Sequence, residues 1–91
     1  MASSIVSKKA RIHPSVKIGN FCRIHDNVVL EKDSVIEDFS TIGCPSAGGG
    51  EAPLVIRRGS LIRSYSLFYE GSEFGARLIT GHRVTVREMT R

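Results

Sequence analysis

An aliphatic side chain returns at every sixth position over residues 12–43, and this period constrains the fold more than any other feature. The repeated positions are Ile12, Ile18, Ile24, Leu30, Ile36 and Ile42. Four positions after each of the first five comes a compact residue: Val16, Cys22, Val28, Ser34 and Ser40. An α-helix would return apolar residues about every 3.6 positions and a strand about every 2. The six-residue period therefore indicates a repeat architecture.

Six residues suit a short strand followed by a sharp turn, with the aliphatic and the compact side chains both pointing inward. Three such segments would close a triangular coil, and successive coils would hydrogen-bond along the axis about 4.8 Å apart. Equivalent positions of successive coils would then form columns of similar side chains. The sequence predicts an all-β fold, a parallel β-helix.

The period breaks at residues 44–53 and then resumes. The later repeat positions are Ile56, Ile62, Phe68, Phe74, Thr80 and Val86, of which Thr80 departs from the apolar rule. The gap from Ile42 to Ile56 is one repeat plus eight residues, so we predict a loop that protrudes at a corner and leaves the stack unbroken. No Lys-Ser or Lys-Thr pair follows the triple glycine in this loop, which argues against a phosphate-binding loop. We predict one domain over residues 1–91, with about four coils.

Composition places the chain among soluble proteins. Hydrophobic residues make up 41% and charged residues 24%, and no apolar run is long enough to cross a membrane. Serines and lysines interrupt residues 1–10, so a secretory signal is not predicted and we expect a cytoplasmic protein. Cys22 and Cys44 are too few for a disulfide framework and lack zinc-site spacing. Cys22 is expected in the core, and Cys44 at the start of the loop.

The net charge of +4 arises in the C-terminal part of the chain. Residues 54–91 contain seven arginines and three glutamates, whereas residues 1–53 contain six basic and six acidic groups. Guanidinium groups match phosphate geometry, so this asymmetry suits a ligand that carries phosphates, such as CoA or a nucleotide sugar. Without a basic helix or an aromatic platform, nucleic acid is not an expected partner. No membrane partner is expected either.

The pairs Ile18-Gly19 and Ile42-Gly43, with the repeats around them, resemble the left-handed β-helix of hexapeptide-repeat acyltransferases over residues 11–88. The left hand is taken from this resemblance, because parallel crossovers are right-handed in about 98% of cases. The resemblance implies a homotrimer with active sites between subunits, and a loop that reaches a neighbouring subunit. The chain resembles either the N-terminal half of those enzymes or a short member of the family.

The segment at residues 69–88 resembles the branch that acetylates sugars and antibiotics. This resemblance implies transfer of an acetyl group from acetyl-CoA to a hydroxyl or amine of a sugar or nucleotide sugar. His82, in Thr80-Gly81-His82, is the candidate general base, because imidazole accepts protons near neutral pH. Candidate cofactor-binding residues are Arg77, Gly81, Arg83 and Arg87. A structural alternative is that His82 hydrogen-bonds Ser64 or a neighbouring subunit.

Counting 18 residues per coil, or 26 across the loop, predicts which side chains lie above one another. One external column would contain Asn20, Asp38, Ser64 and His82. The same counting places Arg83 above Tyr65 and Arg87 above Tyr69, where guanidinium groups would stack on aromatic rings. It also places Glu88 beside Glu70.

Two other classes of function remain open. The chain could be a non-catalytic β-helix scaffold whose open ends mediate assembly. It could also be a zinc protein similar to the γ-class carbonic anhydrases, which share the fold. His13, His25 and His82 follow three different faces of the coil, so they cannot converge on one ion within a chain and no metal is expected.

Overall fold

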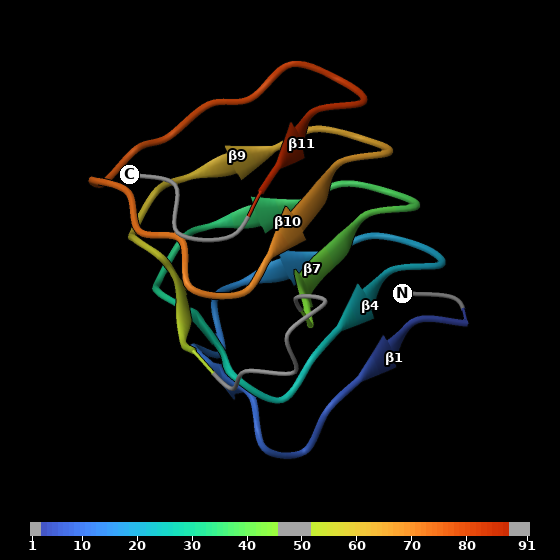
Figure 1. The fold of residues 1–91 in the computed structure, drawn as a ribbon, viewed down its shortest axis with the longest axis vertical. Coiled ribbons are helices and arrows are strands. Elements are labelled where there is room, and N and C mark those ends of the chain that lie inside the picture. Colours follow the sequence, from blue (N-terminus) through green and yellow to red (C-terminus); the bar gives the residue numbers. More distant parts are fainter. Residues whose placement is uncertain (1–2, 46–51, 88–91) are drawn as a thin grey trace.

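The chain forms a left-handed parallel β-helix in the computed structural model, which describes residues 3–45 and 52–87 (Figure 1). Short parallel strands build three sheets, which we call faces A, B and C. Face A contains β1 (Ile5–Val6), β4 (Arg23–Ile24), β7 (Thr41–Cys44), β10 (Leu67–Tyr69) and β11 (Thr85–Val86). Face B contains β2 (Arg11–Ile12), β5 (Val28–Leu30) and β8 (Leu54–Ile56). Face C contains β3 (Lys17–Ile18), β6 (Val35–Ile36) and β9 (Leu61–Ile62).

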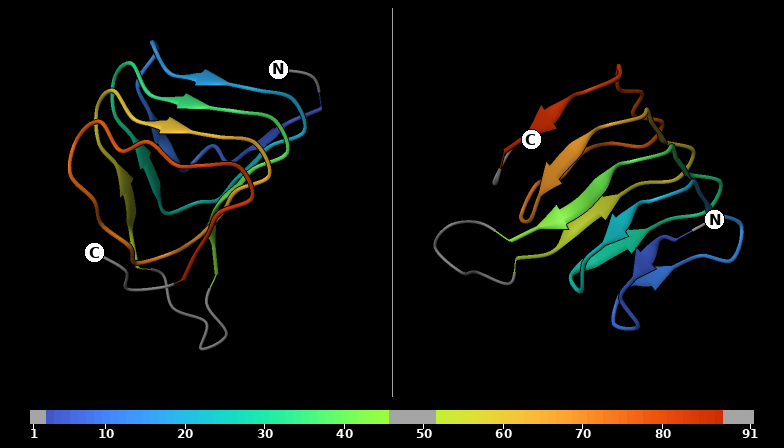
Figure 2. Two further views of the ribbon diagram at one scale, coloured as in Figure 1. Left: turned by 90° about the horizontal axis from the view of Figure 1, so that it is seen from above. Right: turned by 90° about the vertical axis from the view of Figure 1, so that its right-hand side faces the viewer.

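Viewed along its axis, the stack is triangular (Figure 2). Ile24 pairs with Ile42, and Ile42 pairs with Phe68, so the register advances by 18 residues and then by 26 across the insertion. On face B, the pairing of Val29 with Val55 shows the same 26-residue step. The predicted columns and the unbroken stack are confirmed. The five strands of face A, from β1 to β11, are separated by four turns of the coil, which agrees with the prediction of about four coils.

The inward repeat positions form the hydrophobic core. Seven of these side chains are no more than 1% exposed: Ile24, Leu30, Ile36, Ile42, Ile56, Ile62 and Phe68. Cys22 is also buried, as predicted. At the ends of the stack the same columns are only partly covered, since Val6, Ile12 and Ile18 have a neighbouring coil on one side alone.

Buried serines at the compact positions join successive coils by hydrogen bonds. Ser34 Oγ donates to the Arg57 carbonyl at 3.0 Å and accepts from the Ser60 backbone N–H at 3.3 Å. Ser60 Oγ donates to the same carbonyl at 2.8 Å and accepts from the Leu78 N–H at 3.2 Å. A hydroxyl fits here because it is small and satisfies backbone groups that a corner would otherwise bury without partners.

The stack begins earlier than predicted, because β1 pairs with β4 and brings Val6 and Ala10 into repeat positions. The predicted loop boundary at residue 44 was one residue too early. Cys44 belongs to β7 and pairs with Tyr69, since Gly43 forms a bulge that absorbs one inserted residue. Residues 46–51 of the loop lie outside the described part. Within the described ranges, no helix is long and apolar enough to span a membrane.

Candidate functional site

The corner between faces C and A carries His82. The predicted column of Asn20, Asp38, Ser64 and His82 is present at this corner. Each of the first three residues accepts, at its carbonyl, a hydrogen bond from a backbone N–H of the next coil at 2.9–3.1 Å. His82 therefore lies one coil above Ser64, as the counting predicted.

The His82 side chain is exposed, and its charge acts on the carboxylate of Glu37. Arg63 Nε donates to Glu37 Oε1 at 2.7 Å, and Ser64 Oγ lies 3.5 Å from the same oxygen. The Arg63 hydrogen bond is the main cause that lowers the pKa of Glu37, and the charge of His82 acts in the same direction. Glu37 is therefore ionised at neutral pH.

A hollow of about 320 Å³ lies beside this column. Its polar lining comes from Lys17, Glu37, Asp38 and Ser64. Gly19 also lines it. A Cβ at Gly19 would lie 2.9 Å from the Asp38 backbone nitrogen and 3.1 Å from the Glu37 carbonyl carbon, so a larger residue would displace the backbone of the next coil. The hollow could hold a small polar group next to the Ser64 hydroxyl.

The next residues of each coil form an exposed ladder of stacked rings, which we call the aromatic ladder: Phe21, Phe39 and Tyr65. Their ring centroids are 5.2 Å and 5.0 Å apart, and each side chain is about half exposed. The backbone φ of each is close to +60°, which turns the chain at the corner. The Arg83 guanidinium continues the ladder at 5.4 Å from the Tyr65 ring, which confirms the predicted stacking.

The arginines predicted to bind a cofactor lie at three separate places. Arg83 precedes β11 and Arg87 follows it, with the Arg87 guanidinium 4.7 Å from the Tyr69 ring centroid, as predicted. Arg77 lies at the corner between faces B and C, where its N–H donates to the Arg58 carbonyl at 2.9 Å. Within one chain, face C thus separates Arg77 from Arg83.

Gly81 lies directly before His82 in an open setting. The nearest heavy atom to a Cβ added there would be Val84 Cγ2 at 4.0 Å. Nothing around Gly81 in the described residues requires a glycine for packing. Its predicted role, close approach of a ligand to the backbone, stays a prediction.

The three histidines follow different faces, as the counting indicated: His13 comes after β2, His25 after β4 and His82 after the last bridge of face C. In the described ranges no three His, Cys, Asp or Glu side chains are placed to hold a metal ion. The predicted neighbours Glu70 and Glu88 cannot be compared, because Glu88 lies outside the described residues.

The sequence analysis missed the Glu37–Arg63 ion pair and a second pair, Glu31–Arg57, whose Nη1 and Oε2 atoms are 3.0 Å apart. In both pairs the residues are 26 positions apart, which is the step of the strand register across the insertion. An acidic and a basic residue 26 positions apart across the insertion could therefore have been predicted to form an ion pair.

Residues 9–44 match a family model described as bacterial transferase hexapeptide (six repeats). This part of the chain is similar to bacterial transferase hexapeptide repeats. No curated protein and no solved structure matches the chain. The strand register extends the hexapeptide coil beyond the matched residues as far as β11. The corner with His82 is thus part of the same hexapeptide-repeat stack, two coils above the last matched strand pairing of β4 with β7.

Proposed function

We propose that this chain is an acyltransferase that moves an acetyl group from acetyl-CoA to a hydroxyl or amine of a sugar or nucleotide sugar. The observation that carries the proposal is the exposed imidazole of His82 one coil above Ser64, which lines the hollow together with the ionised Glu37. The match to bacterial transferase hexapeptide repeats supports the same class of reaction.

In the proposed reaction, His82 takes the proton from the acceptor hydroxyl or amine while the acceptor attacks the thioester carbonyl. Glu37 would stabilise the imidazolium formed in that step. A backbone N–H near Gly81 would donate to the developing oxyanion. The C–S bond then breaks, and the CoA thiolate receives the proton from His82.

The phosphates of acetyl-CoA would contact Arg83 and Arg87, which flank β11. Since face C separates Arg77 from these two residues, Arg77 would reach the same ligand only from a neighbouring subunit. The proposal therefore requires an oligomer, and threefold symmetry is the arrangement that we propose for a triangular prism with a small core. A trimer would also cover the exposed aromatic ladder.

The oligomeric state can be measured by light scattering. We expect a species of three times the 10.0 kDa chain mass at micromolar concentration. Phe39→Lys, in the middle of the ladder, should shift the protein toward monomer, whereas Val55→Lys on face B should not. A monomeric parent would contradict the trimer. Equal dissociation of both variants would show that the aromatic ladder is not part of the interface.

His82→Asn tests the catalytic assignment. Loss of a general base lowers the rate by a factor of about 100 to 10,000, whereas loss of one hydrogen bond costs about 1 kcal/mol of stability and leaves the chemistry intact. We expect a fall in turnover of at least about a hundredfold, measured as thiol release from acetyl-CoA with a panel of sugar acceptors. His13→Asn, at another corner, is the control. A change of only a few fold in His82→Asn would make His82 structural.

A non-catalytic scaffold is the alternative, and one observation favours it. No strand of the described residues covers the outer edges of β1, β2 and β3, so this end of the stack can pair with another chain. Calorimetric titration with acetyl-CoA separates the two functions. Binding that Arg83→Ala/Arg87→Ala weakens supports the transferase, whereas absence of such binding in a protein that assembles end to end supports the scaffold.

A further inference from the structure

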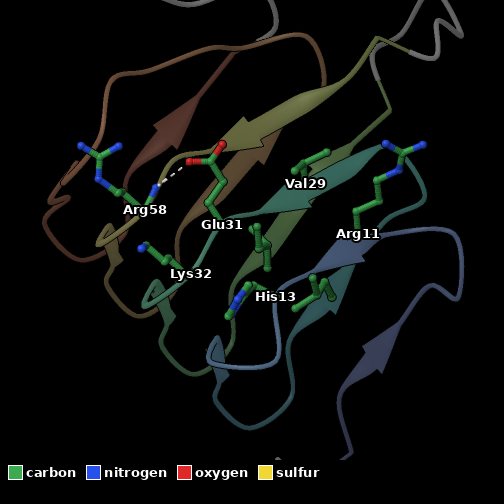
Figure 3. A pocket seen from close by; sticks show the side chains of 8 residues that line it. Arg11, His13, Val29, Glu31, Lys32 and Arg58 are labelled. Carbon is green, nitrogen blue, oxygen red and sulfur yellow. Dashed lines mark hydrogen bonds between the residues drawn. The ribbon is translucent and has the colours of Figure 1, made fainter.

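A second concave site lies beside face B, away from His82. It is a groove of about 790 Å³, within the range of small-molecule pockets. Its side chains come from β2 and β5 and from the turns that follow β2, β5 and β8: Arg11, His13, Val29, Glu31, Lys32 and Arg58 (Figure 3). Because this groove adjoins the corner between faces B and C, its ligand would not touch His82.

Cations border the groove on two sides of an apolar centre. Figure 3 shows Lys32 and Arg58 on one side, Arg11 on the other, and Val29 between them. Arg11, Lys32 and Arg58 are exposed, and among the described residues none of their side chains forms an ion pair. Three positive charges are thus available to a ligand that lies over Val29.

The acidic residue of the groove, Glu31, is already engaged. Its Oε2 accepts from Arg57 Nη1 at 3.0 Å, and its Oε1 accepts from the Arg58 backbone N–H at 3.0 Å. These hydrogen bonds, the one from Arg57 first, lower the pKa of Glu31. The carboxylate therefore stays ionised, it shares Arg57 with Glu73, whose Oε1 lies 3.5 Å from Arg57 Nη2, and it holds the backbone of Arg58 at the rim of the groove.

We propose that this groove binds a small molecule that carries phosphate groups and an apolar portion. Guanidinium and ammonium groups favour phosphate oxygens, and the Val29 side chain offers an apolar surface between them. A nucleic-acid strand fits less well, because it would need a row of aromatic side chains on which successive bases stack, and no Phe, Tyr or Trp lines the groove, whereas a single base can lie on Val29. This site is independent of the proposed acetyl transfer.

Titration of the full chain by two-dimensional NMR tests the proposal, with pyrophosphate, adenosine and adenosine diphosphate as probes. We expect adenosine diphosphate to shift the amides of Glu31, Lys32 and Arg58 and to bind more tightly than either fragment. Shifts confined to residues 81–83 would place the probe at the other corner and overturn the proposal. Equal affinity for pyrophosphate and adenosine diphosphate would overturn the role of Val29.

The double variant Lys32→Ala/Arg58→Ala removes two cations and keeps the Arg58 backbone N–H that Glu31 needs. Both side chains would supply charge-assisted hydrogen bonds to phosphate, so we expect affinity for adenosine diphosphate to fall at least about tenfold. Arg23→Ala, an exposed arginine of face A, is the matched control and should leave affinity unchanged. An equal loss in the control would show a nonspecific charge effect and overturn the site. Tighter binding of a single-stranded oligonucleotide than of adenosine diphosphate would also overturn it.

Discussion

The hydroxyl of Thr80 accepts a hydrogen bond from the backbone N–H of Arg63 at 3.0 Å. One coil below, the equivalent N–H, that of Glu37, donates to the backbone carbonyl of Ile62 at 2.8 Å. The Thr80 side chain therefore continues a ladder that main-chain carbonyls form elsewhere on face C. This explains why the one repeat position that breaks the apolar rule carries a hydroxyl.

Thr80→Val removes this hydroxyl with little change in shape. The Arg63 N–H then loses its acceptor, and we expect the free energy of unfolding to fall by about 0.5–1.5 kcal/mol. Urea denaturation provides the measurement. Thr80→Ser keeps the hydroxyl and should lose less, and Thr85→Val on the exposed side of β11 is the control. If Thr85→Val were as destabilising as Thr80→Val, the hydrogen bond would not be the cause.

Gly43 is required by both its conformation and its neighbours. Its φ is +87°, and a Cβ there would lie 2.4 Å from Val28 Cγ2 in the core. Gly43→Ala combines left-handed backbone strain with overpacking, so we expect a loss of about 2–4 kcal/mol in the free energy of unfolding. Gly75→Ala is the matched control, because no heavy atom lies within 4 Å of its added Cβ. Equal stability of the two variants would show that the bulge relaxes without cost.

The repeat period was sufficient to predict the fold because it specifies which side chains point inward. It did not reveal the bulge at Gly43, since the insertion shows that eight residues are extra but not how they divide between strand and loop. The hexad that begins at Val6 was missed, although the period indicates it. Val6 lies six positions before Ile12, and the compact Ala10 follows four positions later.

Column counting predicted the vertical neighbours at the candidate site, among them Arg83 over Tyr65. It could also have paired Glu37 with Arg63. The hollow beside Ser64 and the groove over Val29 depend on side-chain conformation and on the depth of the corners, which a periodic pattern does not encode. The three predicted arginines are close in sequence. Arg77 and Arg83 nevertheless lie at consecutive corners of the coil, with face C between them.

His25 is a half-buried histidine at the end of β4. Burial is the main cause that lowers its pKa below the ordinary value of 6.5, and the charge of Arg23 lowers it further, while Asp26 opposes this. In the unfolded chain the imidazole takes up its proton at the ordinary pKa, before the folded protein does. The unfolded state thus binds more protons in that range, and stability must fall as pH falls through 6.5.

We expect the contribution of His25 to decline as pH falls through 6.5 and to level off below the folded-state pKa. The pKa values of Glu31 and Glu37 are lowered from 4.5. The stability that these two carboxylates contribute is therefore lost at lower pH than the contribution of His25. His25→Gln should flatten the pH dependence of the free energy of unfolding, by less than about 1 kcal/mol because solvent still screens the ring. Arg23→Ala removes the second cause and should flatten it in part. NMR titration of the His25 ring provides the direct check, and a midpoint above 6.5 in the folded protein would reverse the sign of the effect.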